Sequence, residues 1–273
     1  MPNFAKAYLK VKYGGRIMLL VFDIGNTQIK MGVFKGDDLV VSCRMTTGTK
    51  KTTDEYGISI TTMLLAKGVK IEDISRTIVS SVVPNIMYSL CNAIKNYIGT
   101  EPIVVAPGIK TGVCIKTDNP KETGADLIAD VAGANHFYGG PCIVVDFGTA
   151  TKYEVITEKG EFIACVISPG VGIMTEALSS KAAQLPQITL KKPESILTSN
   201  TVECMQAGIV YGYIGQVEYI VSKIKEEMGI PDMKVIATGG FGNIIASETK
   251  CIDIYDKNLT LKGLKVIADK NKK

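Results

Sequence analysis

The sequence predicts an α/β protein made of two related halves, and three observations support this fold class. Short apolar runs typical of buried strands alternate with longer helical patterns. An apolar run ending in Asp-x-Gly occurs at Asp23 and again at Asp146, 123 residues later. A third strand-like run, 235–238, ends in the glycine pair 239–240. At 273 residues the chain can form two lobes, each within the usual domain range of ~100–200 residues.

Composition narrows the class of protein further. Hydrophobic residues make up 46% of the chain and charged residues 21%, which is typical of a globular protein and not of a disordered one. The 31 basic and 27 acidic residues are scattered along the sequence, so we expect no nucleic-acid partner. Arg16, Arg44 and Arg76 are the only arginines, so an anion must be bound by Lys, backbone N–H groups or a metal ion.

The cysteines and the apolar runs indicate the cellular compartment of the protein. The seven Cys residues include no Cys-x-x-Cys pair and their number is odd, which favours reduced thiols. The longest apolar run near the N-terminus, 17–22, is far shorter than the ~20 residues of a membrane-spanning helix. We therefore expect a cytoplasmic protein with no membrane contact.

The predicted first lobe covers residues 18–119 and follows an N-terminal extension at 1–17. A polar turn is expected at 36–38. Further along the chain, a helix is expected at 85–97. Strands are expected, in order, at 18–22, at 29–33, from 39 onward, at 77–83 and at 103–105.

The predicted second lobe covers residues 120–273 and repeats the first hairpin. Its strand 143–147 matches 20–24, and a turn at 158–160 leads to a return strand at 162–167. Helices are expected after Gly124, from Thr201 towards Glu227, and at 261–267. The last of these is a candidate to pack back on the first lobe.

The two Asp-x-Gly loops carry side chains suited to a polyphosphate. Asp23 and Asp146 each end a strand, and polar side chains follow the glycine. The glycine allows close backbone approach, the polar groups donate hydrogen bonds, and the carboxylate can hold Mg²⁺ or another cation. One Asp-x-Gly alone can equally be a simple turn, whereas the duplication favours two loops that clamp one nucleotide.

The glycines that follow 235–238 would let a flat adenosine lie against the backbone, although a strand-to-helix turn also explains them. The run matches neither a Walker sequence nor Gly-x-Gly-x-x-Gly. This argues against the P-loop and Rossmann folds.

Together these segments resemble the superfamily of sugar kinases, actin and acetate kinase, whose duplicated, ribonuclease-H-like lobes close over an ATP cleft. Within it, the chain is similar to the type III pantothenate kinases over about residues 18–267. The motifs that carry the resemblance are Asp-Ile-Gly-Asn-Thr at 23–27, Gly-Ala-Asp at 124–126, Asp-Phe-Gly-Thr-Ala at 146–150, Ser-Pro-Gly at 168–170, Asn-Thr-Val at 200–202 with Met-Gln-Ala-Gly at 205–208, and Thr-Gly-Gly at 238–240.

The resemblance implies transfer of the γ-phosphoryl group of ATP to pantothenate, the first step of coenzyme A synthesis. It also implies Mg²⁺ and a monovalent cation, K⁺ or NH₄⁺, as cofactors. Phosphoryl transfer needs alignment and charge neutralisation, which carboxylates, a lysine and glycine-backed donors supply. The implied ATP contacts are Asp23, which also organises Mg²⁺, with Ile24, Gly25, Asn26, Thr27, Gln28, Ile29, Lys30, Thr149, Gly239 and Gly240.

The implied pantothenate site has Asp126 as the group that accepts the proton of the substrate hydroxyl. The first turn of a helix favours a charged carboxylate, and this preference would place an Asp there even without a catalytic role. The implied substrate contacts are Gly124, Ala125, Asp126, Leu127 and Thr201.

Two further expectations come from the resemblance. Asp146 is the implied ligand of the monovalent cation. A homodimer is implied, in which Thr201 of one subunit completes the pantothenate site of the other. Thr201 follows Asn200 at the start of a helical pattern, so a role as helix N-cap is also open to it.

The chain departs from the family pattern at several positions. The Arg that normally follows Gly-x-Asp is Leu127, which offers no charge to the carboxylate of pantothenate. Lys152 and Glu154 replace a Thr and an Asp of the second phosphate motif, and Ala164 and Cys165 replace two glycines. Without a bidentate Arg, Lys110, Lys116, Lys181 or backbone groups are left to bind the acid.

Leu127 keeps two other functions open. One is a non-catalytic nucleotide-binding regulator, like the Bvg accessory factor of the same family. The other is a kinase that acts on a different hydroxylated molecule. An intact Asp126 favours a kinase.

Overall fold

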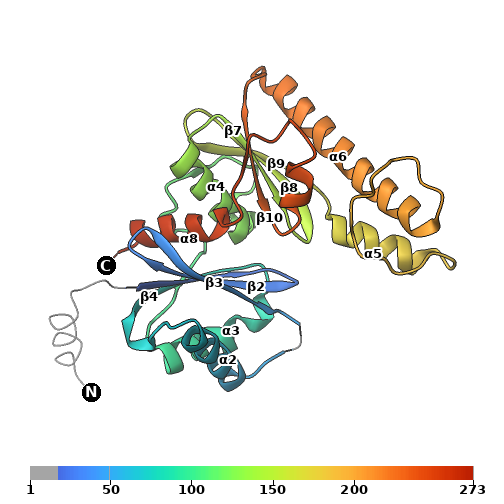
Figure 1. Cartoon of the computed structure of the whole chain (residues 1–273). Coiled ribbons are helices and arrows are strands. Elements are labelled where there is room, and N and C mark those ends of the chain that lie inside the picture. The colour runs from blue at the N-terminus through green and yellow to red at the C-terminus, as the bar shows by residue number, and fades with distance from the viewer. Residues whose placement is uncertain (1–17, 49, 273) are drawn as a thin grey trace, which may run out of the picture. The chain divides into compact units, whose positions relative to one another are not determined.

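The computed structural model describes residues 18–48 and 50–272, and the expected N-terminal extension lies outside the described residues (Figure 1). The described chain forms two compact units. Unit 1 consists of the described residues up to 110, of 124–129 and of those from 264 onward. Unit 2 consists of 111–123 and 130–263.

Unit 1 contains a five-stranded sheet in the order β3-β2-β1-β4-β5. The strand β1 pairs antiparallel with β2 and parallel with β4, so a hairpin stands beside a crossover connection. All five expected strands are confirmed, with ends that differ by a few residues. Their bounds are β1 Met18–Ile24, β2 Gln28–Lys35, β3 Asp38–Thr46, β4 Ile74–Ser81 and β5 Ile103–Val104.

Two helices pack on one face of this sheet, α2 (Thr53–Ala66) and α3 (Pro84–Ala93), and a π-helical turn at Ile94–Ile98 extends α3 (Figure 1). The helix α3 confirms the expected helix at 85–97. The sequence analysis did not predict α2, because the exposed Ile58 and Leu65 blur its apolar stripe.

Unit 2 contains a six-stranded sheet in the order β11-β10-β7-β8-β9-β6. Its hairpin β7-β8 repeats the antiparallel pairing of β1-β2, and β10 runs parallel to β7. The expected repeat of the hairpin is therefore present. The strand bounds are β6 Cys114–Ile115, β7 Cys142–Phe147, β8 Ala150–Ile156, β9 Glu161–Pro169, β10 Lys234–Gly239 and β11 Ile254–Tyr255.

Helices cover both faces of the unit 2 sheet (Figure 1). On one face α4 (Ala125–Tyr138) packs Val131 and Ala134 against Cys142 and Val144 of β7. On the other face α6 (Thr201–Met228) packs against the alternate residues of the same strands. The remaining helices are α5 Val171–Lys181, α7 Gly242–Ala246 and α8 Leu259–Lys270, and short 3₁₀ turns occupy Ile71–Asp73 and Pro120–Glu122.

The C-terminal half of α8 belongs to unit 1. Arg76 of β4 donates a hydrogen bond to the Ala268 carbonyl over 3.1 Å and pairs with the Asp269 carboxylate at 2.9 Å. Burial alone would raise the pKa of Asp269, but the hydrogen bonds from Arg76, Lys265 and Lys272 lower the pKa of that carboxyl to about 2.

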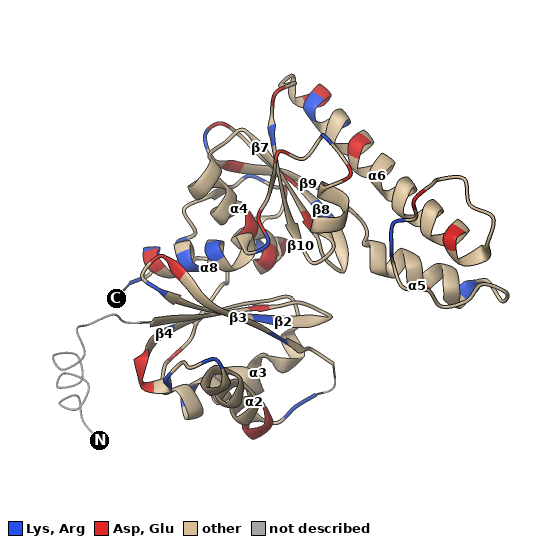
Figure 2. Ribbon diagram, viewed as in Figure 1, with Lys and Arg blue, Asp and Glu red and all other residues tan. Residues whose placement is uncertain are grey.

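Charge and thiols are distributed without a single dominant patch. Figure 2 shows Lys, Arg, Asp and Glu interspersed along the elements of both units. The seven cysteines are free, and Cys142 is the buried one. In the described part of the chain, each helix is too short or too polar to cross a bilayer.

Candidate active site

The first Asp-x-Gly loop joins β1 to β2 in unit 1. Its backbone is fixed by a hydrogen bond from the Gly25 amide to the Gln28 carbonyl (3.0 Å) and by one from the Thr47 hydroxyl to the Gly25 carbonyl (2.6 Å). The Asp23 side chain is only 9% exposed at the end of β1, whereas residues 26–28 are exposed. The loop is thus a rigid backbone with polar groups on its outer side.

Lys30 lies directly opposite Asp23 in the β1-β2 register, with its Nζ 3.6 Å from Asp23 Oδ2 and its side chain 24% exposed. Ile24 and Ile29, which the sequence analysis placed among the ATP contacts, have wholly buried side chains. They belong to the unit 1 core, so only their backbone atoms are available to a ligand.

Asp126 is the second residue of α4, and it lies in unit 1 together with Asp23. Its Oδ1 accepts a hydrogen bond from the Leu127 amide over 2.9 Å. A Cβ at Gly124 would lie 2.5 Å from the same oxygen, so a side chain at 124 would displace the carboxylate. The Gly-x-Asp spacing therefore holds the Asp126 carboxylate in its present position. Leu127, half-buried, adds only hydrocarbon to this site.

The second Asp-x-Gly loop joins β7 to β8 in unit 2 and exposes Thr149. Gly170, at the end of β9, donates a backbone hydrogen bond to the Thr149 carbonyl over 3.1 Å. A Cβ at 170 would lie 2.3 Å from that carbonyl oxygen and 2.5 Å from the Gly148 oxygen. The Ser-Pro-Gly motif thus anchors the second loop, because only glycine allows this close contact.

Lys152 lies directly opposite Asp146 in the β7-β8 register. Its Nζ is 2.7 Å from Asp146 Oδ2, and the two side chains are 11% and 10% exposed. Glu154 follows two residues later on the same face of β8 and is wholly buried. Among the described residues, neither Glu154 carboxylate oxygen has a hydrogen-bond partner.

The electrostatics of this cluster are dominated by burial. Burial raises the pKa of Glu154 well above its ordinary value, and the charge of Asp130 on α4 adds to the effect, while Lys152 opposes it. Burial therefore favours the protonated form of Glu154, while the Lys152 ammonium pairs with the Asp146 carboxylate.

The residues around Asp146 do not fit a monovalent cation. K⁺ needs several oxygen ligands, and one Asp146 oxygen is already paired with an ammonium group. Two unit charges 4 Å apart repel by about 4 kcal/mol at an effective dielectric constant of ~20, so K⁺ on the other oxygen would be opposed by Lys152. Among the described residues, no group of three or more His, Cys, Asp or Glu side chains is placed to hold a metal ion.

Mg²⁺ fits the first loop better. Asp23 offers a carboxylate at a strand end, and its partner Lys30 is 3.6 Å away, too far for a tight ion pair. Mg²⁺ is usually held by one or two carboxylates together with substrate phosphates and water, so a single Asp beside a phosphate site suffices.

The glycines of the third motif have different roles. Gly239 is buried with φ +94°, and a Cβ there would lie 2.5 Å from the Phe147 carbonyl, so β10 can end against β7 only with glycine at this position. Gly240 is exposed, and a Cβ on it would meet nothing within 4 Å. Gly239 is thus required by the packing of β10 against β7, and the adenosine contact expected at the two glycines stays a prediction.

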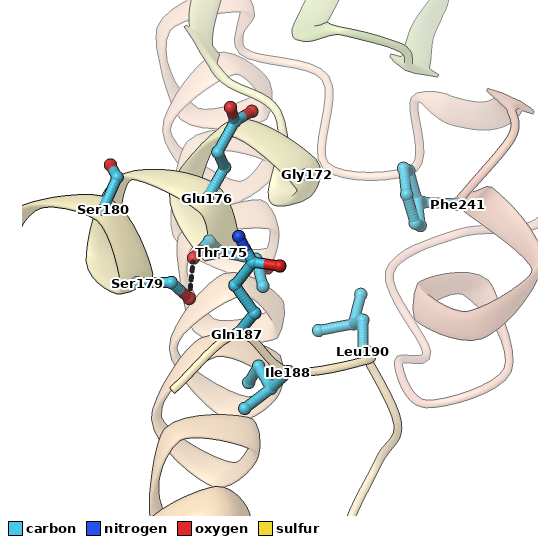
Figure 3. Close-up of a pocket in the computed structure, with 9 residues that line it drawn as sticks. All are labelled: Gly172, Thr175, Glu176, Ser179, Ser180, Gln187, Ile188, Leu190 and Phe241. Atoms are coloured by element: carbon cyan, nitrogen blue, oxygen red, sulfur yellow. Dashed lines mark hydrogen bonds between the residues drawn. The ribbon is translucent and has the colours of Figure 1, made fainter. Parts of the chain in front are cut away.

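A pocket of about 480 Å³ lies entirely in unit 2, and one of its lining residues, Phe241, follows Gly240 in the sequence (Figure 3). Phe241 lies across from Gly172 of α5, Glu176 and Gln187 supply polar groups, and Ile188 and Leu190 complete an apolar side. This volume falls within the ~300–1,000 Å³ typical of small-molecule sites. The sequence analysis missed these residues, because the pocket joins segments that are far apart in the chain.

Thr201 is the first residue of α6 and is exposed. The helix N-cap is Asn200, whose side-chain oxygen accepts a hydrogen bond from the Glu203 amide over 3.0 Å. The capping role that was open to Thr201 therefore falls to its neighbour.

These observations define the class of protein first. Two sheets that repeat an acid-tipped hairpin, with a glycine turn after a parallel strand, form the duplicated actin-like fold of sugar kinases. Component A of (R)-2-hydroxyglutaryl-CoA dehydratase from Acidaminococcus fermentans is similar in structure, with TM-score 0.54 and 16% identity over 94% of this chain and 100% of that one. A putative Baf family transcriptional activator from Campylobacter jejuni has TM-score 0.57 and 18% identity over 92% and 98%. At such identities these likenesses show the fold alone.

Sequence comparison then identifies the family. The profile of the type III pantothenate kinases matches residues 19–223. A type III pantothenate kinase from Agathobacter rectalis is 49% identical over 253 residues, which cover 93% of this chain and 97% of that protein. The chain belongs to the type III pantothenate kinase family, as its motifs predicted.

Proposed function

We propose that the protein transfers the γ-phosphoryl group of ATP to the primary hydroxyl of pantothenate and so begins coenzyme A synthesis. The observation that carries this proposal is the intact Gly-x-Asp turn of a family member, in which Gly124 leaves room for the Asp126 carboxylate. The two units are the proposed lobes of the kinase.

ATP is the proposed ligand of both acid-tipped loops. Lys30 and the exposed residues 26–28 are suited to its phosphates, since an ammonium and backbone N–H groups neutralise the charge that develops during transfer. Thr149 would contact phosphate from unit 2. The pocket lined by Phe241, Ile188 and Leu190 has the size and the apolar wall that a nucleoside needs. Mg²⁺, held at Asp23, would add charge neutralisation at the phosphates.

Asp126 is the proposed general base. It lies in the first turn of α4, where it can orient the pantothenate hydroxyl and accept its proton. Gly124, Ala125, Leu127 and Thr201 are the other proposed substrate contacts. Because Leu127 has no charge, the carboxylate of pantothenate must be bound by lysine or backbone groups.

A homodimer is the proposed assembly, with Thr201 completing the site of the second subunit. Support comes from exposed apolar side chains on and before α5 and α6, which a second copy would cover. They are Ile167, Ile173, Leu178, Ile196, Leu197 and Val202. Light scattering of the protein in solution measures its mass, which should be that of two chains if the assembly is a homodimer.

We propose the cytoplasm as the location, since ATP and reduced thiols are both found there and the seven cysteines are free. The monovalent cation predicted at Asp146 stays a prediction. We leave it out of the proposed reaction because Lys152 already pairs with that carboxylate.

The experiment measures ADP formation from ATP and Mg²⁺, with and without pantothenate. We expect turnover that depends on pantothenate and that falls about 10²- to 10⁴-fold in Asp126→Asn, the usual range for a general base. Asp118→Asn, at an exposed Asp that precedes α4 in the chain, is the matched control and keeps its activity.

Other outcomes separate the remaining functions. Nucleotide binding without any turnover would support the regulator and overturn the kinase. Turnover with another alcohol but not with pantothenate would change the acceptor. Leu127→Arg tests the departure from the family, because a sharp fall in the KM for pantothenate would show that the missing charge limits binding.

A further inference from the structure

The pair Asp146–Lys152 has a counterpart in the other half of the molecule. In each hairpin the lysine is the direct cross-strand partner of the aspartate, Lys30 for Asp23 and Lys152 for Asp146. The sequence repeat does not predict this equivalence, since a shift of 123 residues takes Lys30 to Tyr153.

Turn length explains the equivalence. Four residues, 25–28, separate the paired Ile24 and Ile29 of the first hairpin, whereas three, 148–150, separate Phe147 and Thr151 of the second. The shorter turn moves Lys152 to the position that faces Asp146. With a turn of equal length the residue opposite Asp146 would be Tyr153, whose ring packs in the core on the other face of the sheet.

The surroundings of Lys152 hold it in place. The Lys152 Nζ is 2.7 Å from Asp146 Oδ2, and Glu154 lies two residues further along the same strand. The wholly buried Asp130 of α4 acts on Glu154 through its charge. A lysine with an 11% exposed side chain has little freedom to leave such acidic surroundings. The ammonium is therefore a fixed part of the second loop.

We propose that the Lys152 ammonium serves as a built-in counter-ion for Asp146 and replaces the monovalent cation that the family resemblance implies at this loop. Its role is positioning, because Asp146 and the Gly148–Thr149 backbone belong to one turn. This inference rests on the proposed function for the measurement of ADP formation. For the measurement of melting temperature it rests only on the geometry of unit 2.

The test compares KCl with tetramethylammonium chloride at equal ionic strength, the latter cation being too large for a carboxylate site. For the unmodified protein we expect ADP formation and the melting temperature to be the same in both salts. In Lys152→Thr, which removes the ammonium and leaves space, we expect activity to fall and K⁺ to restore it by about tenfold or more, with a rise in melting temperature.

Two comparison variants make the result decisive. Lys152→Arg keeps the charge and stays independent of K⁺. Lys262→Thr is the matched control, since Lys262 also pairs with a buried carboxylate of unit 2, that of Asp256, and gains no response to K⁺. If Lys152→Thr does not fold, the unmodified protein and the Arg variant still decide the question.

A requirement for K⁺ in the unmodified protein, in either readout, would overturn the proposal. An enzyme that is inactive in every salt would count against the proposed function only, because the melting temperatures still report whether Asp146 accepts K⁺.

Discussion

The two acid-tipped hairpins combine the same pair of side chains in different settings. In unit 1 the Asp23–Lys30 distance is 3.6 Å and the lysine is 24% exposed, whereas in unit 2 the Asp146–Lys152 distance is 2.7 Å and the lysine is 11% exposed. Two residues beyond the lysine, unit 1 has Gly32 and unit 2 has Glu154, each paired with the equivalent residue of the first strand.

The difference shows how one backbone motif acquires two uses. Gly32, two residues beyond Lys30, adds no side chain beside that lysine, whose side chain is 24% exposed and can turn towards a phosphate. A buried carboxyl group beside Lys152 leaves no room for such movement. We therefore expect changes in the first pair to affect catalysis and changes in the second pair to affect stability and ion dependence.

Among changes in the two Asp–Lys pairs, the largest effect is expected for Asp23→Asn. The change removes the carboxylate proposed for Mg²⁺, and kcat should fall about 10²- to 10³-fold, as for the loss of one charge-stabilising group. The melting temperature should stay close to that of the unmodified protein, because Lys30 can turn to solvent. Steady-state kinetics and thermal denaturation measure both, with the exposed Asp73→Asn as control. Full activity in Asp23→Asn would remove this loop from the site.

Asp146→Asn should have its main effect on stability. The change leaves the enclosed Lys152 without its carboxylate, and breaking a buried pair costs about 3–5 kcal/mol. At about 2–4 °C per kcal/mol for a chain of this size, the melting temperature should fall by roughly 10 °C. Calorimetry measures the change, and a loss of activity at an unchanged melting temperature would contradict the proposed contrast between the pairs.

The two hairpins also show which parts of the structure the sequence predicts. Apolar runs and turn residues predict the strands of both hairpins, because each strand depends on its local pattern. The partner of Asp146 was not predicted, because cross-strand register depends on the three-residue turn 148–150, and one residue more or fewer changes which side chain lies opposite. The pocket near Phe241 was missed because it is assembled from α5, 187–190 and the turn before α7.

A moderate effect is expected for Lys30→Met. Charged hydrogen bonds contribute about 1.5–3 kcal/mol each, so the Kd for ATP should rise roughly ten- to a hundredfold. In contrast to Lys152→Thr, this variant should gain nothing from K⁺. Isothermal titration in both salts makes the comparison. An unchanged Kd would show that the lysine of unit 1 does not face the phosphates.

The smallest effect is expected for Glu154→Gln, and it depends on pH. The pKa of Glu154 is raised in the folded protein above the ordinary 4.5, by burial first and then by Asp130 and Asp146, while Lys152 opposes the shift and Cys165 of β9 adds a minor charge effect. Stability from such a group is present below the unfolded pKa and is lost as pH rises through the folded pKa. Glutamine imitates the protonated form, so the variant should be more stable than the unmodified protein at mildly alkaline pH, by about 1 kcal/mol or roughly 2–4 °C, and equal to it in acid. A benefit that is constant over pH would contradict a protonated Glu154.

Gly170 connects the second Asp-x-Gly loop to α5, the helix that lines the pocket. Its amide binds the Thr149 carbonyl, and the next residue begins α5, whose Gly172, Thr175 and Glu176 line the pocket. The start of α5 and the Thr149 loop are therefore joined through one residue. A ligand in this pocket that displaced the start of α5 would therefore also displace the backbone of Thr149, so the shape of that ligand would reach the second loop.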